Sequence, residues 1–139
     1  MRLVIMLLSS LAFVASGCSQ GTGENSNQST TESVQDQKGV YRTVDVAAFE
    51  AALNEGEVQL VDVRTPGECA NGVIEGAENI NIGDSDFDQQ LEKLDKDKPV
   101  LVYCASGGRS ARAMNMMKSK GFEKVLNLKG GYGAWVKHE

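Results

Sequence analysis

The chain has 139 residues, 41% of them hydrophobic and 24% charged, which suits one domain with a tail and is too short for two sizeable cores. With 14 basic and 19 acidic residues the net charge is −5, which excludes the basic surface that nucleic-acid binding needs. The single histidine, His138, rules out most Ser-His or Cys-His dyads and argues against His-rich zinc or haem sites.

Residues 1–17 have the pattern of a secretory signal peptide. Arg2 precedes an apolar run from Leu3 to Val14, which is shorter than the roughly 20 residues that cross a bilayer. The small residues before Cys18 resemble the bacterial lipoprotein box, although Ala15 stands where that box usually has Leu. We expect cleavage before Cys18, its acylation, and an exported protein that is lipid-anchored in the cell envelope and faces the periplasm. The alternative is a plain secreted protein with a spare thiol.

Residues 18–39 are predicted to be the lipidated N-terminus and a flexible linker. Ser19 to Lys38 include almost no apolar side chain, so burial cannot offset the entropy of ordering them. About 20 such residues span roughly 25 Å as a flexible coil. That length would hold a domain clear of a membrane to which the N-terminal acyl chains bind.

Residues 40–139 alternate helical and strand patterns, which predicts one α/β domain. In chain order the pattern predicts a helix over 46–53, strands over 58–63 and 80–82, a helix over 87–94, a strand over 100–104, a helix over 110–120, a strand over 125–128 and a helix over 132–137. This alternation favours a central, mostly parallel sheet of about five short strands with helices on both faces.

The segment that carries chemistry follows the strand predicted over 100–104. Cys104 ends this strand, and the chain enters the next helix through Ala105, Ser106, Gly107, Gly108, Arg109 and Ser110. Ligands of open α/β sheets bind beyond the carboxyl ends of the strands. Two glycines let amides turn inward, the helix start adds free N–H groups, and Arg109 adds a cation. We expect a Cys104 thiolate with a lowered pKa, open to donors, beside a site for a small oxyanion.

These segments resemble the single-domain rhodaneses. The resemblance rests on residues 60–68 (Leu-Val-Asp-Val-Arg-Thr-Pro-Gly-Glu), on Gly76-Ala77, on residues 104–110, and on Gly130-Gly131 with Trp135. It implies a rhodanese-like three-layer fold and a sulfurtransferase of the thiosulfate sulfurtransferase type. A small anionic donor such as thiosulfate would give sulfane sulfur to Cys104, and the persulfide would pass it to a thiol or a cyanide-like acceptor.

The same resemblance implies roles for the neighbouring residues. Ala105 to Ser110 would bind the substrate, with loop amides around the transferred sulfur and Arg109 on the anionic donor. Asp62 and Arg64 would support the site by ordering nearby loops. The activity that the resemblance implies requires no metal site and no cofactor. We expect the protein to be a monomer.

The chain departs from the rhodanese pattern at two places. Residues 72–77 read Gly-Val-Ile-Glu-Gly-Ala, without the usual His and Pro, and Cys69 replaces an aromatic residue. We interpret Cys69 as a smaller core side chain. The other hypothesis is a second thiol near enough to Cys104 to resolve a persulfide or to form a disulfide.

Two functional alternatives to a sulfurtransferase remain at this point, together with an interpretation that gives Cys104 no chemical role. A phosphatase or arsenate-type enzyme would also use a cysteine loop with an arginine, but protein phosphatases have Cys-x5-Arg and this chain has Cys-x4-Arg. The fold could also serve as a redox or sulfur-binding module of the cell envelope without sulfur transfer. Finally, Cys104 could be a buried, inert cysteine at the end of a strand.

Overall fold

The computed structural model describes residues 39–139. The predicted signal peptide, the acylated Cys18 and nearly all of the linker lie outside the described residues. From residue 39 onward, no helix combines the length and apolar character needed to cross a membrane.

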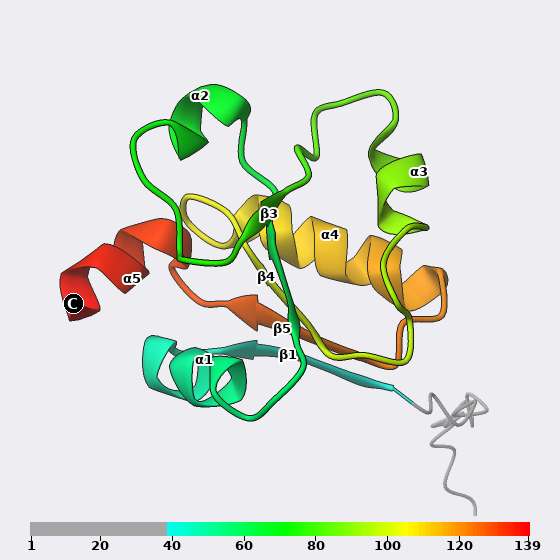
Figure 1. Cartoon of the computed structure of the whole chain (residues 1–139), viewed down its shortest axis with the longest axis horizontal. Coiled ribbons are helices and arrows are strands. Elements are labelled where there is room, and N and C mark those ends of the chain that lie inside the picture. The colour runs from blue at the N-terminus through cyan, green and yellow to red at the C-terminus, as the bar shows by residue number, and fades with distance from the viewer. Residues whose placement is uncertain (1–38) are drawn as a thin grey trace, which may run out of the picture. The chain divides into compact units, whose positions relative to one another are not determined.

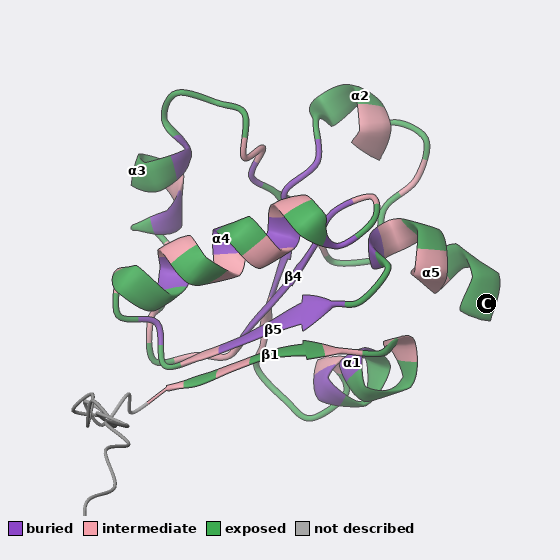
Figure 2. Cartoon of the chain, turned by 180° about the vertical axis from the view of Figure 1, so that it is seen from behind, coloured by how far each residue is buried: buried purple, intermediate pink, exposed green. Residues whose placement is uncertain are grey.

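A sheet of five parallel strands forms the centre of the domain, in the order β1-β5-β4-β2-β3 (Figure 1). The strands are β1 (Val40–Val44), β2 (Gln59–Asp62), β3 (Glu78–Asn79), β4 (Val100–Tyr103) and β5 (Lys124–Leu128). Every residue of β4 is buried, as expected for a central strand covered on both faces. Figure 2 shows the same burial continuing along β5.

Helices cover both faces of this sheet and give it two apolar cores. The helices are α1 (Val46–Leu53), α2 (Pro66–Cys69), α3 (Phe87–Leu91), α4 (Gly108–Ser119) and α5 (Gly131–His138). On one face, Phe49 of α1 meets Trp135 of α5 edge to face, with ring centroids 6.4 Å apart. On the other face, Phe87 of α3 and Met117 of α4 pack in one cluster with Val102 of β4. The predicted α/β class, parallel sheet and two-sided helix cover are confirmed.

Several element boundaries differ from the sequence-based expectation. The strand expected over 80–82 begins earlier, as β3, and the amides of Ile80 and Ile82 extend its pairing by bonding the carbonyls of Asp62 and Val63 at 2.9 and 3.2 Å. β1 and α2 were not predicted, because β1 is a partly exposed edge strand and α2 has only four residues. α4 starts two residues before the expected helix, and α3 ends three residues early.

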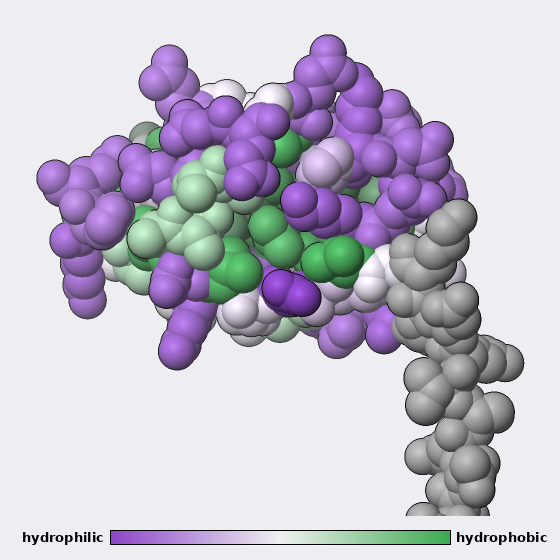
Figure 3. Space-filling view, turned by 90° about the horizontal axis from the view of Figure 1, so that it is seen from below, coloured by the Kyte–Doolittle hydropathy of each residue, from purple (hydrophilic) through white to green (hydrophobic). Residues whose placement is uncertain are grey.

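One face of the described domain combines apolar and hydrophilic surface. Seen from below, Figure 3 shows one patch of apolar surface within a hydrophilic surround. α1 exposes three small apolar residues, Ala47, Ala48 and Ala51. Among residues 39–139, the exposed large hydrophobic side chains are Val40, Val73 and Val136.

Candidate active site

Cys104 directly follows β4, and three residues then turn the chain into α4. The N-cap of α4 is Gly107, whose φ of 99° lies in the left-handed region that glycine tolerates best. A Cβ at this position would also lie 3.1 Å from the carbonyl oxygen of Leu128 and 3.3 Å from the amide nitrogen of Gly130. Glycine is therefore favoured here both by conformation and by the close approach of the chain that follows β5.

The sulfur of Cys104 accepts hydrogen bonds from this loop and from the first turn of α4. The Gly107 amide donates to Sγ at 3.1 Å and the Ser110 hydroxyl at 3.4 Å. Burial raises the pKa of Cys104, but hydrogen bonds from Ser110 and from the amides of Ser106 and Gly107 outweigh it, so the pKa lies below its ordinary value. The expected lowered pKa is confirmed, and it favours the nucleophilic thiolate.

The start of α5 fixes the carbonyl groups of the same loop. The Tyr132 amide donates to the Cys104 carbonyl at 2.7 Å, and the Gly133 amide donates to the Ala105 carbonyl at 3.1 Å. Gly131 has a φ of 58°, and a Cβ on it would collide with the backbone of residues 104–106. These two bonds hold the start of the loop against α5, while the Gly107 amide donates to the sulfur.

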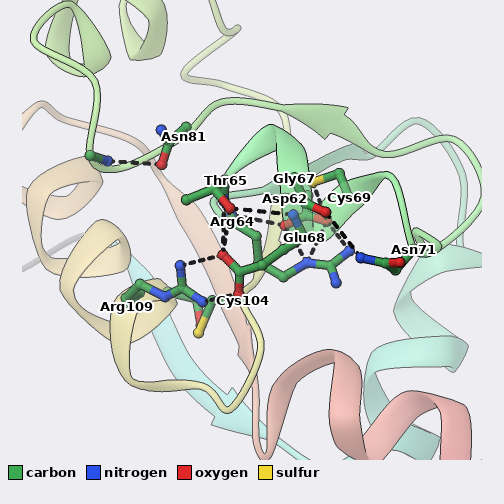
Figure 4. Close-up of polar contacts among 12 residues, drawn as sticks. Asp62, Arg64, Thr65, Gly67, Glu68, Cys69, Asn71, Asn81, Cys104 and Arg109 are labelled. Carbon is green, nitrogen blue, oxygen red and sulfur yellow. Dashed lines mark hydrogen bonds and ion pairs between the residues drawn. The ribbon is translucent and has the colours of Figure 1, made fainter.

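One expectation about Cys104 is wrong: its side chain is not open to solvent, with an exposed fraction of 0%. The Arg109 side chain lies against this sulfur, and Glu68 holds the guanidinium (Figure 4). Two hydrogen bonds, of 2.9 and 2.5 Å, join the Arg109 nitrogens to the Glu68 carboxylate oxygens. The Glu68 carboxylate comes from another part of the sequence, so the motif around Cys104 did not reveal it.

Glu68 is the residue of this site that sequence reasoning missed. It belongs to α2, and it forms a capping box with Thr65: the Thr65 amide donates to Oε2 at 3.0 Å, and the Thr65 hydroxyl accepts from the Glu68 amide at 3.3 Å. The hydrogen bond from Arg109, followed by those from Thr65, lowers the pKa of Glu68 to about 2. The spacing Thr65-x-x-Glu68 is the signal that could have indicated this cap.

Asp62 and Arg64 form a buried ion pair beside this region. Arg64 donates to both oxygens of Asp62, at 2.6 Å in the shortest bond, and also to the Gly72 carbonyl at 2.7 Å. Its guanidinium lies 4.2 Å from the centroid of the Tyr132 ring, at the start of α5. The pair thus connects the end of β2 to the following loop and to α5, at positions suited to the supporting role that we predicted.

Cys69 is directed at this ion pair. Its Sγ lies 3.4 Å from Oδ2 of Asp62, and Cys69 and Cys104 are both free thiols (Figure 4). Burial, followed by the charge of Asp62, raises the pKa of the Cys69 thiol. A protonated thiol is a poor nucleophile. The geometry therefore favours the interpretation of Cys69 as a packing residue over a resolving role.

Ala105 and Gly108 are the remaining residues of the predicted substrate-binding loop. Neither residue forms a hydrogen bond with the Cys104 sulfur in the described domain. The loop also contacts β5, because the side-chain amide of Asn127 donates to the Gly107 carbonyl at 3.4 Å. Between residues 39 and 139, no group of three or more His, Cys, Asp or Glu residues could hold a metal ion. The chemistry available at this site is that of a thiolate with hydrogen-bond donors and one paired cation.

Comparison with known proteins matches residues 45–138 to the family model of the rhodanese-like domain. The chain belongs to the rhodanese-like domain family. A sulfurtransferase from Allochromatium vinosum is 39% identical over 82 residues, which cover 59% of this chain and 75% of that protein. The thiosulfate sulfurtransferase GlpE of Shewanella oneidensis is 36% identical over 78 residues, covering 56% and 75%. The structure of the human single-domain sulfurtransferase TSTD1 shares 27% identity with a TM-score of 0.63, covering 70% of this rhodanese-like chain and 96% of TSTD1.

Proposed function

We propose that this protein is a rhodanese-type sulfurtransferase that carries sulfane sulfur as a persulfide on Cys104. The observation that carries the proposal is the pair of hydrogen bonds from the Gly107 amide and the Ser110 hydroxyl to Sγ, at the carboxyl end of a central strand. Relatives named as sulfurtransferases support this general activity. The name of the Shewanella relative supports thiosulfate as a donor.

In the proposed reaction, the Cys104 thiolate attacks the outer sulfur of thiosulfate. The bond between the two donor sulfurs breaks, and sulfite leaves with its electron pair as a new sulfur–sulfur bond forms on Cys104. A thiolate or cyanide then attacks the outer persulfide sulfur and regenerates the Cys104 thiolate. Loop amides that already bond Sγ would stabilise the anion throughout this cycle.

Transfer of sulfur from thiosulfate to cyanide, measured as thiocyanate formation, tests this proposal. The wild-type protein and Cys69→Ala should be active, because Cys69 faces Asp62 and has a raised pKa. Cys104→Ala should be inactive. Activity that persists in Cys104→Ala, or its absence from the wild type with both thiosulfate and a persulfide donor, would contradict the proposal.

One observation favours a second candidate, a redox or sulfur-binding module without sulfur transfer. Cys104 has no exposed surface, so a donor reaches it only after a neighbouring side chain moves. The Glu68–Arg109 pair is the mobile element we assign, because both side chains are about a third exposed and such pairs contribute little to stability. A Cys104 thiol that becomes a persulfide or a disulfide but passes no sulfur to a thiol or to cyanide would favour this module.

We also propose that the protein is anchored to the cell envelope through acylated Cys18, by the lipoprotein resemblance of residues 1–18. Metabolic labelling with a fatty acid tests this in the full chain. The wild type should incorporate label and partition with membranes, and Cys18→Ser should do neither. Equal labelling of both proteins would contradict the anchor.

A further inference from the structure

The cation beside the Cys104 sulfur is already paired with a carboxylate. Arg109 lies against the sulfur, yet both of its terminal nitrogens bond the Glu68 carboxylate, at 2.9 and 2.5 Å. With Cys104 ionised, these three groups sum to one negative charge. Asp62 and Arg64 neutralise each other within their own buried pair. A donor approaching the sulfur therefore meets a site with no free cation among these groups.

We propose that Glu68 determines donor specificity at Cys104: its carboxylate holds the Arg109 guanidinium and so disfavours dianionic donors relative to donors of lower charge. This inference rests on the proposed sulfurtransferase function. Glu68 acts through Arg109, and it is a positioning residue for that guanidinium rather than a group that reacts with sulfur.

Electrostatics makes the expected effect proportional to donor charge. Thiosulfate carries two negative charges, and methanethiosulfonate carries one. Both lose an outer sulfur to a thiolate, with sulfite leaving from the first and methanesulfinate from the second, so the bonds broken and formed are equivalent. Removing one negative charge from the site therefore changes the free energy of approach about twice as much for the dianion as for the monoanion.

Glu68→Gln removes this charge with little change in local structure. Glutamine at the third helical position can accept the same bond from the Thr65 amide, so the capping box of α2 is retained. Glu68→Asp keeps the charge and serves as the conservative variant. Glu57→Gln is the matched control, because Glu57 forms an exposed ion pair with Lys98 at 2.6 Å, and the charged groups that act on it in the described domain, Lys98 and Asp95, lie outside the Cys104 loop.

The experiment measures kcat/KM for both donors in these four proteins, with cyanide as acceptor. We expect Glu68→Gln to raise kcat/KM by about fivefold for methanethiosulfonate and by about twenty-five-fold for thiosulfate. High salt should shrink both increases, because it screens partly exposed charges. Glu68→Asp and Glu57→Gln should keep the donor ratio of the wild type.

Failure of this inference is distinct from failure of the proposed function. If the wild type uses both donors and Glu68→Gln changes both values by the same factor, or lowers the value for thiosulfate, Glu68 does not set donor specificity. A salt-independent change would also overturn the inference, because it would reflect altered packing. If the wild type uses neither donor, the proposed function itself is wrong.

Discussion

At the level of single residues, Ser110 has one hydroxyl hydrogen and two acceptors for it. Its Oγ lies 3.4 Å from the Cys104 sulfur and 3.1 Å from the Gly107 carbonyl oxygen. A charged acceptor binds a hydrogen more strongly than a neutral one, so the hydroxyl favours the sulfur once Cys104 is ionised. Ser110 therefore stabilises the thiolate more than the thiol, which lowers the pKa of Cys104.

Ser110→Ala should raise the pKa of Cys104. A hydrogen bond to a charged group contributes roughly 1.5–3 kcal/mol, so the thiolate fraction below the pKa should fall by about tenfold or more. The thiolate forms as pH rises through the pKa, so the variant should need a higher pH to reach the same fraction. The thiolate ultraviolet absorbance of Cys104, after subtraction of the Cys104→Ala signal, measures this. Ser119→Ala, an exposed serine at the far end of α4, should leave the titration unchanged.

The sequence predicted those site residues that follow one another in the chain. Cys104, Gly107 and Ser110 belong to one strand–loop–helix segment, so their proximity follows from local geometry. Glu68 lies far away in sequence and reaches Arg109 only because β2 and β4 are paired neighbours in the sheet. Local spacing carries no information about such a contact, which is why the pairing of Glu68 with Arg109 beside the sulfur was not expected.

At the level of elements, the turn into α5 acts as a support for the Cys104 loop. Gly131→Ala should distort this loop, because its φ of 58° is unfavourable for alanine and the added Cβ would collide with the backbone of residues 104–106. Misplacement of a reacting group by about 1 Å can cost about a hundredfold in rate, so we expect a loss of that size in kcat/KM.

Gly56→Ala provides the matched control for Gly131→Ala. Gly56 also has a positive φ, of 133°, but a Cβ on it would meet no atom within 4 Å. This variant should lose stability from backbone strain and keep its catalytic rate per folded molecule. Equal losses of kcat/KM in the two variants would contradict the assigned role of the α5 turn.

The buried pair of Asp62 and Arg64 connects β2 to the loop at Gly72 and to α5. Asp62→Ala leaves the Arg64 guanidinium buried without its counter-ion, a change that costs roughly 3–5 kcal/mol in the free energy of unfolding. Urea denaturation measures this loss. Glu57→Ala, which breaks an exposed pair with Lys98, should leave the midpoint nearly unchanged. Similar midpoints for the two variants would show that the buried pair does not stabilise the fold.

The elements that the sequence predicted well are those with a strong apolar pattern. β4 and α1 were placed within one residue of their observed bounds, since the first is a continuous apolar run and the second has Asp45 as its N-cap. β1 and β3 lie at the two edges of the sheet and are largely exposed, so they lack that pattern. Strand pairing, rather than local composition, defines these edge strands.

At the level of the whole molecule, the two cores share one sheet, so we expect them to unfold together. Met117→Ala empties a fully buried position on the α4 face and should cost roughly 2–5 kcal/mol. Trp135 fluorescence reports the opposite face, and circular dichroism reports the whole domain. Both midpoints should fall by the same amount, whereas a change confined to circular dichroism would show independent cores. Val136→Ala, at an exposed position, should move neither midpoint.

The mass of the Cys104 peptide after incubation with thiosulfate, in the absence of any acceptor, tests the central claim most directly. A thiolate held by the Gly107 amide and the Ser110 hydroxyl should gain the mass of one sulfur atom, and cyanide should remove it. Cys69 should remain unmodified, because its pKa is raised. An unmodified Cys104 peptide under conditions in which sulfite is released, or a sulfur atom found on Cys69 instead, would contradict the account.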